Sequence, residues 1–361
     1  MAHLFEPLKL RDITLANRIG IPPMCQYSAH DGMASDWHFV HYGSRAVGGA
    51  ALMIIEATAV TPEGRISPGD LGIWDDKQIE PLARIVRFLQ TQGCVAALQL
   101  AHAGRKASVG LGWQAQGTLS EADGGWEVVA PSPVPFDGGY AVPHELDEAA
   151  IRHVVALFAA GARRAREAGF QTVEIHAAHG YLLHQFLSPL SNRRTDAYGG
   201  SFENRTRLVR EVVAAVRAEW PERLPLLIRL SATDWVDGGW NADETVELCR
   251  ALKMFGVDLV DVSSAGIVPT AKFSVGPGFQ TEFAARVRRE ADIPTAAVGL
   301  ITSPAQADHI IRTGQADMVL LGREILRNPY WPMNAAHELG LAASWPLQYL
   351  RAAPPGSTGR Q

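Results

Sequence analysis

Cysteine is scarce in this sequence, with three residues in 361: Cys25, Cys94 and Cys249. An odd, scattered set of this kind cannot form a disulfide framework, and it cannot supply the four thiolates that usually hold an iron–sulfur cluster. The small disulfide-stapled secreted domains are therefore excluded as a class. We expect a protein of the reducing cytoplasm.

Long apolar runs and an excess of one charge are also missing. No stretch is long enough to span a bilayer, and residues 1–7 do not begin a secretory signal. The formal net charge is −5, without a long basic or acidic run, so nothing indicates a nucleic-acid or membrane partner. We expect a soluble protein whose partners are small molecules.

What the sequence does contain is a regular series of eight short apolar runs, each typical of a buried strand. They are Ile19–Met24, Ala51–Ile55, Val95–Leu100, Thr172–Ile175, Leu226–Leu230, Leu259–Val262, Thr295–Val298 and Met318–Leu321. Amphipathic helical patterns lie between most of them, at Lys77–Gln92, Asp147–Ala168, Ser201–Glu219, Asp243–Phe255 and Gln280–Ala291. Alternation of strand and helix predicts parallel pairing.

Eight such units favour a single α/β domain, residues 1–361, folded as a closed (β/α)₈ TIM barrel. A doubly wound sheet would more often carry a glycine-rich GxGxxG turn after its first strand, and none is present. Alternating apolar residues at 8–15 predict an N-terminal hairpin. The Gly/Pro-rich segment 106–143 after the third strand is long enough to be a lid or substrate loop, and we expect residues 352–361 to be a flexible tail.

In this fold the chemistry belongs at the C-terminal ends of the strands. The residues there form a list of candidates: Cys25, Tyr27, Ala57, Thr58, Gln99, His102, His176, His179, Arg229, Ser263, Ser264, Gly299, Gly322 and Arg323. Gly299 and Gly322 expose backbone N–H groups after strands seven and eight, and Arg323 suits a phosphate dianion. We predict a phosphate site there, the alternative being turn glycines beside a surface arginine.

His176, His179 and Tyr181 bring two imidazoles and a phenol within six residues. Such a group can bind an oxyanion, ligate a metal or shuttle protons, or its histidines can be structural groups satisfied by backbone. We predict no metal, because the nearby acids Glu56 and Glu174 lie within strands. We expect those acids to be buried and paired with arginines, with Arg229 and Arg18 as candidates.

No lysine ends a strand, which argues against a Schiff-base aldolase; Lys106 lies just beyond, on the loop. The remaining groups suit flavin mononucleotide. Gln99 offers a donor and an acceptor to a pyrimidine edge, and Arg229 can stabilise negative charge on the reduced ring. A phosphosugar enzyme shares several of these groups and stays an alternative.

Four segments together resemble the old yellow enzyme family: Pro23–Tyr27, Gln99–Lys106, His176–Tyr181 and Phe186–Gly200. The resemblance extends from Leu4 to about Arg351, and the paired histidines with Cys25 resemble the thermophilic-type bacterial subgroup and its xenobiotic reductases. It implies an FMN-containing barrel, an NADPH dehydrogenase and ene-reductase. Such an enzyme uses NADPH or NADH to reduce the C=C bond of α,β-unsaturated carbonyl or nitro compounds.

The resemblance also assigns roles by position. The residues implied to contact FMN are Pro23, Met24, Cys25, Ala57, Gln99, Arg229, Gly299, Gly322 and Arg323. His176 and His179 would bind the substrate oxygen, Tyr181 would donate the proton, and Tyr27 would help to hold the substrate. Cys25 would modulate the flavin's redox behaviour, the alternative being a small buried hydrophobe.

Near the C-terminus, residues 348–351 resemble a segment in which an arginine enters the neighbouring subunit's active site. Arg351 is the matching position, although Leu-Arg-Ala stands where the subgroup's pattern has Glu-Arg-Gly-Trp. The resemblance thus implies a homodimer or homotetramer. The rival interpretations are another FMN barrel, of the dienoyl-CoA or dihydroorotate reductase type, and a phosphosugar-binding lyase or isomerase.

Overall fold

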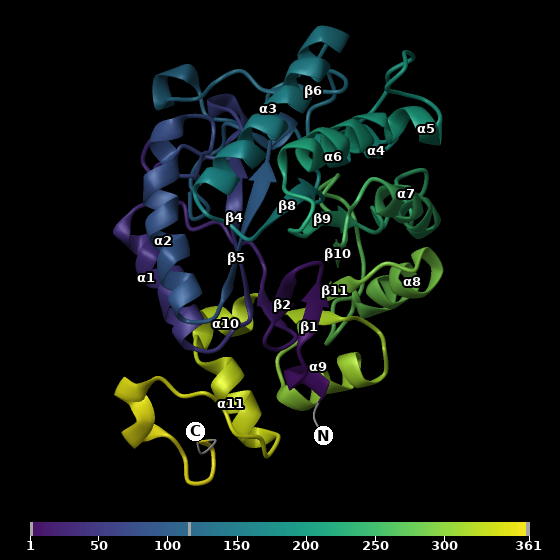
Figure 1. Ribbon diagram of the computed structural model, residues 1–361. Helices are drawn as coiled ribbons and strands as arrows, with labels where there is room; N and C mark the ends of the chain where they lie inside the picture. Colours follow the sequence, from purple (N-terminus) through teal and green to yellow (C-terminus); the bar gives the residue numbers. More distant parts are fainter. Residues whose placement is uncertain (1–2, 115–116, 359–361) are drawn as a thin grey trace.

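Eight parallel strands close into a barrel in the computed structural model, which describes residues 3–114 and 117–358 (Figure 1). In their order around the barrel, the strands are β3 (Ile19–Ile21), β4 (Leu52–Ala59), β5 (Val95–Ala101), β8 (Thr172–Ala177), β9 (Leu226–Ser231), β10 (Leu259–Ser263), β11 (Thr295–Val298) and β12 (Met318–Leu320). Every predicted run forms one of these strands. The predicted TIM barrel is confirmed.

Helices surround the strands, as parallel pairing requires. The longer ones are α1 (Asp36–Val47), α2 (Ile79–Thr91), α3 (Glu148–Glu167), α6 (Arg207–Glu219), α7 (Ala242–Met254), α8 (Thr281–Ala291), α9 (Pro304–Arg312) and α11 (Trp331–Glu338). The short ones are α4 (Leu182–Leu187), α5 (Phe202–Arg205) and α10 (Arg323–Arg327). The single helix predicted over 201–219 is interrupted at Thr206, whose hydroxyl donates to the carbonyls of Phe202 and Glu203 and so competes with the helical pattern.

Strand β4 is longer than its apolar run predicts. All eight of its residues are buried, and its pairing with β5 shifts register between Ile55 and Thr58. A bulge of this kind re-aims the side chains around it. It lets the polar Glu56 and the small Ala57 lie inside the strand, where the alternation of a regular strand would not predict them.

The predicted hairpin is also confirmed, as β1 (Leu8–Leu10) paired with β2 (Ile13–Leu15). Leu10 and Leu15 pack in one buried cluster with Leu52 and Val95, which begin β4 and β5. The hairpin therefore covers the N-terminal end of the barrel. The opposite end, where the strands finish, is left for the site.

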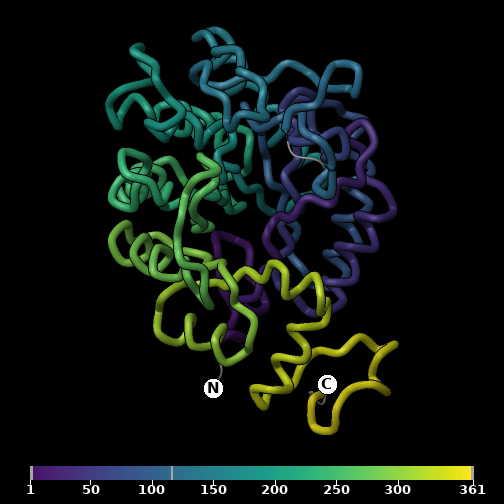
Figure 2. Tube along the Cα trace, turned by 180° about the vertical axis from the view of Figure 1, so that it is seen from behind, coloured from purple at the N-terminus to yellow at the C-terminus, as the bar shows by residue number. Residues whose placement is uncertain are grey.

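The segment 106–143 and the C-terminal tail both follow defined paths where the structure describes them. Within the first, β6 (Val129–Ala130) pairs with β7 (His144–Glu145), which directly follows the segment. In the tail, Thr358 forms a bridge with Ala343; residues 359–361 lie outside the described part. The C-terminal segment extends beyond the ring of barrel helices (Figure 2). None of the helices within the described ranges is long and apolar enough to cross a membrane.

Candidate active site

His176 lies at the end of β8 and is 3% exposed. Its Nδ1 accepts the backbone N–H of Ala178 at 3.3 Å, so the ring proton is on Nε2, which is left to donate to a ligand. Burial, and then the charge of Arg229, lower the pKa of His176 well below its ordinary value. The imidazole is therefore a neutral donor at pH 7.

His179 follows on a turn with a left-handed backbone, φ +58°. Its ring stands nearly perpendicular to that of His176, with 5.3 Å between centroids, and its Nε2 lies 2.7 Å from the Ser263 hydroxyl. Burial and then Arg229 lower the pKa of this imidazole too. The structure thus brings the two predicted histidines together, as neutral rings.

Tyr181 completes the group, with its ring 5.0 Å from that of His176. Desolvation, and then nearby Cys25 and Tyr27, raise the pKa of the phenol well above its ordinary value, so it stays protonated at neutral pH. The Lys106 ammonium lies 5.0 Å from the Tyr181 ring and donates to the His179 carbonyl at 2.8 Å. Lys106 therefore belongs to this group of side chains, although its position beyond the strand end in the sequence did not indicate it.

A cavity of about 440 Å³ opens at the ends of β3, β9, β10, β11 and β12. Its lining includes six of the residues predicted to contact FMN: Pro23, Met24, Arg229, Gly299, Gly322 and Arg323. Arg229 forms an ion pair with Asp261 at 2.8 Å. The exposed Arg323 forms no hydrogen bond or ion pair with the part of the chain that the structure describes. A free guanidinium beside two strand-end glycines fits the predicted phosphate site.

Gln99 lies in β5, where its Nε2 donates to Glu174 at 2.8 Å. This bond commits part of its donor capacity and leaves its Oε1 to accept a bond. Glu174 does not pair directly with an arginine as predicted, because Arg229 pairs with Asp261 instead. The prediction missed Asp261 because it lies within an apolar strand, β10.

Glu56 has different partners from the arginine that was predicted. Its carboxylate accepts from the Tyr42 hydroxyl and from the backbone N–H of Gln26, and it lies 3.6 Å from His38 Nε2. Arg18, the other candidate, donates to backbone carbonyls. Both side-chain partners, Tyr42 and His38, lie on α1, a helix that the sequence patterns did not reveal.

Three further predicted residues lie on the loops and strands around Tyr181. Ala57 and Tyr181 line one small cavity of about 10 Å³. Burial, then the charges of Asp70 and Glu56, raise the pKa of Cys25, so it is a neutral thiol. Tyr27, at φ +53°, stands edge-on to Trp113 of the 106–143 loop, 5.8 Å between centroids.

Other strand-end residues serve the scaffold. His102 accepts the Gly104 N–H, Thr58 donates to the Glu56 carbonyl, and Ser264 donates to Gln280. Within the described residues, no group of three or more histidine, cysteine, aspartate or glutamate side chains is arranged to hold a metal ion.

The sequence matches a known protein family over nearly its whole length. The model of the NADH:flavin oxidoreductase / NADH oxidase family matches residues 3–342. The chain belongs to this family. An NADPH dehydrogenase of Geobacillus thermodenitrificans (strain NG80-2) is 50% identical over 350 residues, 96% of this chain and 98% of the relative. The resemblance to the old yellow enzyme family is confirmed.

Solved structures agree on the fold. Morphinone reductase in complex with tetrahydroNAD is 28% identical, with a TM-score of 0.78 and coverage of 99% of this chain and 94% of the other. A 2-naphthoyl-CoA reductase has a TM-score of 0.84 at 23% identity. This chain spans about half of that longer one (52%), and the likeness shows the fold alone.

Membership of this family makes the protein a flavin-dependent oxidoreductase with FMN as its cofactor. The cavity residues fit that group: Arg323 is free to meet a phosphate, and Arg229 stands, 7% exposed, in the cavity wall. Arg351 lies elsewhere, exposed on the short helix Leu347–Ala352. That helix is in the C-terminal segment, away from β8 in Figure 1.

Proposed function

We propose that the protein reduces the C=C bond of α,β-unsaturated carbonyl or nitro compounds, with NADPH or NADH as the reductant. FMN held at this site would supply hydride transfer from the nicotinamide to the alkene. The observation that carries the proposal is the group of His176, His179 and Tyr181 at the end of β8, with Arg229 of the large cavity close enough to depress both histidine pKa values. The site proposed to bind the substrate oxygen would thus lie next to the cavity proposed to bind the flavin.

The two imidazoles would hold the substrate oxygen. Negative charge gathers on that oxygen as hydride reaches the β-carbon, and neutral N–H donors placed beforehand stabilise it in a site from which water is excluded. Nε2 of His176 carries a proton for this purpose. His179 would supply the second donor through whichever ring nitrogen carries its proton, since its Nε2 already faces Ser263.

Tyr181 would give the proton to the α-carbon. Its raised pKa keeps the phenol protonated until needed, and the Lys106 ammonium above the ring favours the negative charge left after transfer. Tyr27 and Trp113 would form the wall that faces the alkene. Cys25 would lie beside the flavin ring as a neutral thiol.

We further propose that two sets of residues hold the two ends of the flavin. Arg323, Gly299 and Gly322 would hold the phosphate, while Gln99 and Arg229 would meet the pyrimidine edge. The names of related proteins support a nicotinamide as the hydride donor. Curated relatives are called NADPH dehydrogenase, and one solved structure is of morphinone reductase in complex with tetrahydroNAD. Pro23, Met24 and Ala57 would pack on the ring.

The test is spectroscopic. Purified protein should be yellow, bleach with NADPH under anaerobic conditions and regain its colour with 2-cyclohexenone. His176→Ala should still be reduced by NADPH, but stopped-flow reoxidation by the enone should slow by about 10²-fold or more, the typical loss of an oxyanion donor. His153→Ala, on the outer helix α3, is the matched control and should behave as wild type.

Two results would contradict the proposal. Colourless protein that cannot be reconstituted with FMN would show that the protein does not use this cofactor. A phosphosugar enzyme would then be the better assignment. Unchanged enone reoxidation in His176→Ala would remove the oxyanion role while leaving the flavin chemistry intact.

A further inference from the structure

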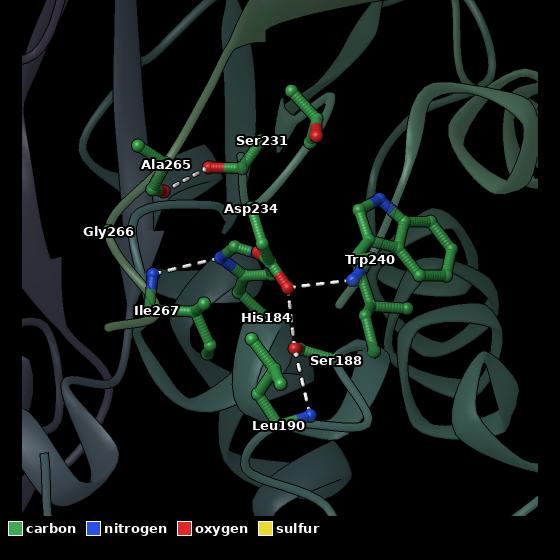
Figure 3. A network of polar contacts seen from close by, with 12 residues as sticks. His184, Ser188, Leu190, Ser231, Asp234, Trp240, Ala265, Gly266 and Ile267 are labelled. Carbon is green, nitrogen blue, oxygen red and sulfur yellow. Dashed lines mark hydrogen bonds and ion pairs between the residues drawn. The ribbon is translucent and has the colours of Figure 1, made fainter. Parts of the chain in front are cut away.

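Gly180, between His179 and Tyr181, is held in place by side chains of the helix that follows it. His184 Nδ1 accepts the Gly180 N–H at 2.9 Å, and Gln185 Nε2 donates to the Gly180 carbonyl at 2.7 Å. Both peptide groups of this residue are therefore fixed by α4. Figure 3 shows the surroundings of His184.

Behind His184 lies a carboxylate from the loop after β9. His184 Nε2 lies 2.9 Å from Asp234 Oδ1, and both side chains are fully buried. Asp234 Oδ2 accepts from the Ser188 hydroxyl at 2.6 Å and from the Trp240 backbone N–H at 2.7 Å (Figure 3). The carboxylate thus has two hydrogen-bond donors on Oδ2 and the imidazole of His184 beside Oδ1.

These contacts define one tautomer of His184. Because Nδ1 accepts from a backbone N–H, the ring proton belongs on Nε2, where it faces Asp234. Burial alone would raise the pKa of Asp234, but the interaction with His184 and the bonds from Ser188 and Trp240 hold it below its usual value. The carboxylate is therefore ionised and acts only as an acceptor.

The turn needs such support. His179 and Gly180 both have left-handed backbone, at φ +58° and +74°, a region that a histidine adopts only at a cost in energy. The turn packs against Gly266 with no room for a side chain on either glycine. The Lys106 ammonium donates to the carbonyls of both His179 and Gly266, at 2.8 and 3.2 Å.

We propose that His184 and Asp234 are positioning residues for His179 and Tyr181. Asp234 selects the His184 tautomer that accepts the Gly180 N–H, and this bond holds the turn that aims the imidazole and the phenol at the substrate. The inference rests on the proposed function, in which those two groups meet the alkene. Neither His184 nor Asp234 touches the large cavity.

Asp234→Asn tests the tautomer. The Ser188 and Trp240 donors require the amide oxygen in place of Oδ2, which turns the amide NH₂ toward His184 Nε2. His184 must then protonate Nδ1, and that proton faces the Gly180 N–H. A long-range ¹H–¹⁵N spectrum of histidine-labelled protein should show the His184 proton on Nε2 in wild type and on Nδ1 in the variant, with the signal assigned by its loss in His184→Asn.

The kinetic consequence should be confined to one half-reaction. A misplacement of about 1 Å can cost on the order of 10²-fold, so reoxidation by 2-cyclohexenone should slow by tenfold to 10²-fold. Reduction by NADPH should stay within about twofold of wild type. Asp243→Asn, an exposed aspartate on α7, is the matched control and should change neither the tautomer nor the rates.

A second pair of variants serves if Asp234→Asn does not fold. His184→Asn keeps a side-chain acceptor near the Gly180 N–H and should retain most of the enone rate, whereas His184→Ala should lose it. Equal rates in these two, an Nδ1 proton in wild type, or full enone turnover in an Asp234→Asn protein with an inverted tautomer would each overturn the proposal. If wild type itself ignored enones, the proposed function would fail, and the tautomer would still decide the local geometry.

Discussion

Two carboxylates and one guanidinium share the interior of the barrel. Glu174 and Asp261 are fully buried, and Arg229 pairs with Asp261. Burial, and then the negative charge of Asp261, raise the pKa of Glu174 to about 8; burial raises the pKa of Asp261 to about 6. Glu174 therefore keeps its proton at neutral pH, because one arginine cannot balance two anions in a dry core.

This proton links stability to pH. The folded-state pKa of Glu174 lies above the ordinary value of 4.5, so folding is favoured below that value and the contribution is lost as pH rises toward about 8. Glu174→Gln should remove this slope. We would measure Tm by thermal unfolding between pH 5 and pH 9. The Tm of the variant should rise relative to that of wild type by a few degrees as pH rises, since about 1 kcal/mol shifts Tm by roughly 2–4 °C in a large domain.

Glu247→Gln, on the exposed face of α7, is the control, and its Tm should follow that of wild type at every pH. A Glu174→Gln protein with an unaltered pH slope would mean that Glu174 is ionised in the fold. At this scale the sequence revealed acids inside apolar strands but not their partners. Glu56 meets Tyr42 and His38 from a neighbouring helix, and no local pattern encodes that contact.

At the scale of elements, the turn after β8 carries the chemistry and depends on glycine. A Cβ on Gly180 would collide with the carbonyl oxygen of Gly266, and φ is +74°. Gly180→Ala should therefore destabilise the fold by more than the roughly 1–3 kcal/mol of left-handed strain alone. It should also slow enone reoxidation by displacing Tyr181.

Gly200→Ala separates the cost of backbone strain from the cost of the collision with Gly266. Gly200 has a similar φ, +80°, but open space around its Cβ position, so this variant should show backbone strain only. Unfolding in urea gives both losses of stability. Equal losses in the two variants would show that the contact with Gly266 is not tight.

Elements were predictable where burial is continuous along the chain. Buried strands of a parallel sheet are near-continuous apolar runs, which is why all eight were located. Histidines beside a turn glycine likewise marked the end of β8. His184 and Asp234 were not foreseen, because they lie fifty residues apart and meet only after β9 has closed on β8. Pairing between distant loops leaves no periodic signal.

At the scale of the whole molecule, the remaining question concerns a second copy of the chain. Arg351 is exposed on a C-terminal helix that lies away from its own active site, and beside it Leu347, Tyr349 and Leu350 are 76%, 40% and 45% exposed. An exposed apolar cluster around an arginine is typical of an interface. We propose that this segment docks on a partner and carries Arg351 to the partner's site.

Arg351→Ala should then raise the KM for 2-cyclohexenone, by roughly 10- to 150-fold if the contact is worth about 1.5–3 kcal/mol, as for charged hydrogen bonds. Bleaching with NADPH should show whether the nicotinamide is affected too. Arg152→Ala, at a surface arginine on α3 that pairs with Glu148, should leave both unchanged. Sedimentation should find wild type to be a dimer or tetramer. A monomeric wild type, or unaltered enone and NADPH affinities in Arg351→Ala, would leave Arg351 an ordinary surface residue and each active site complete within one chain.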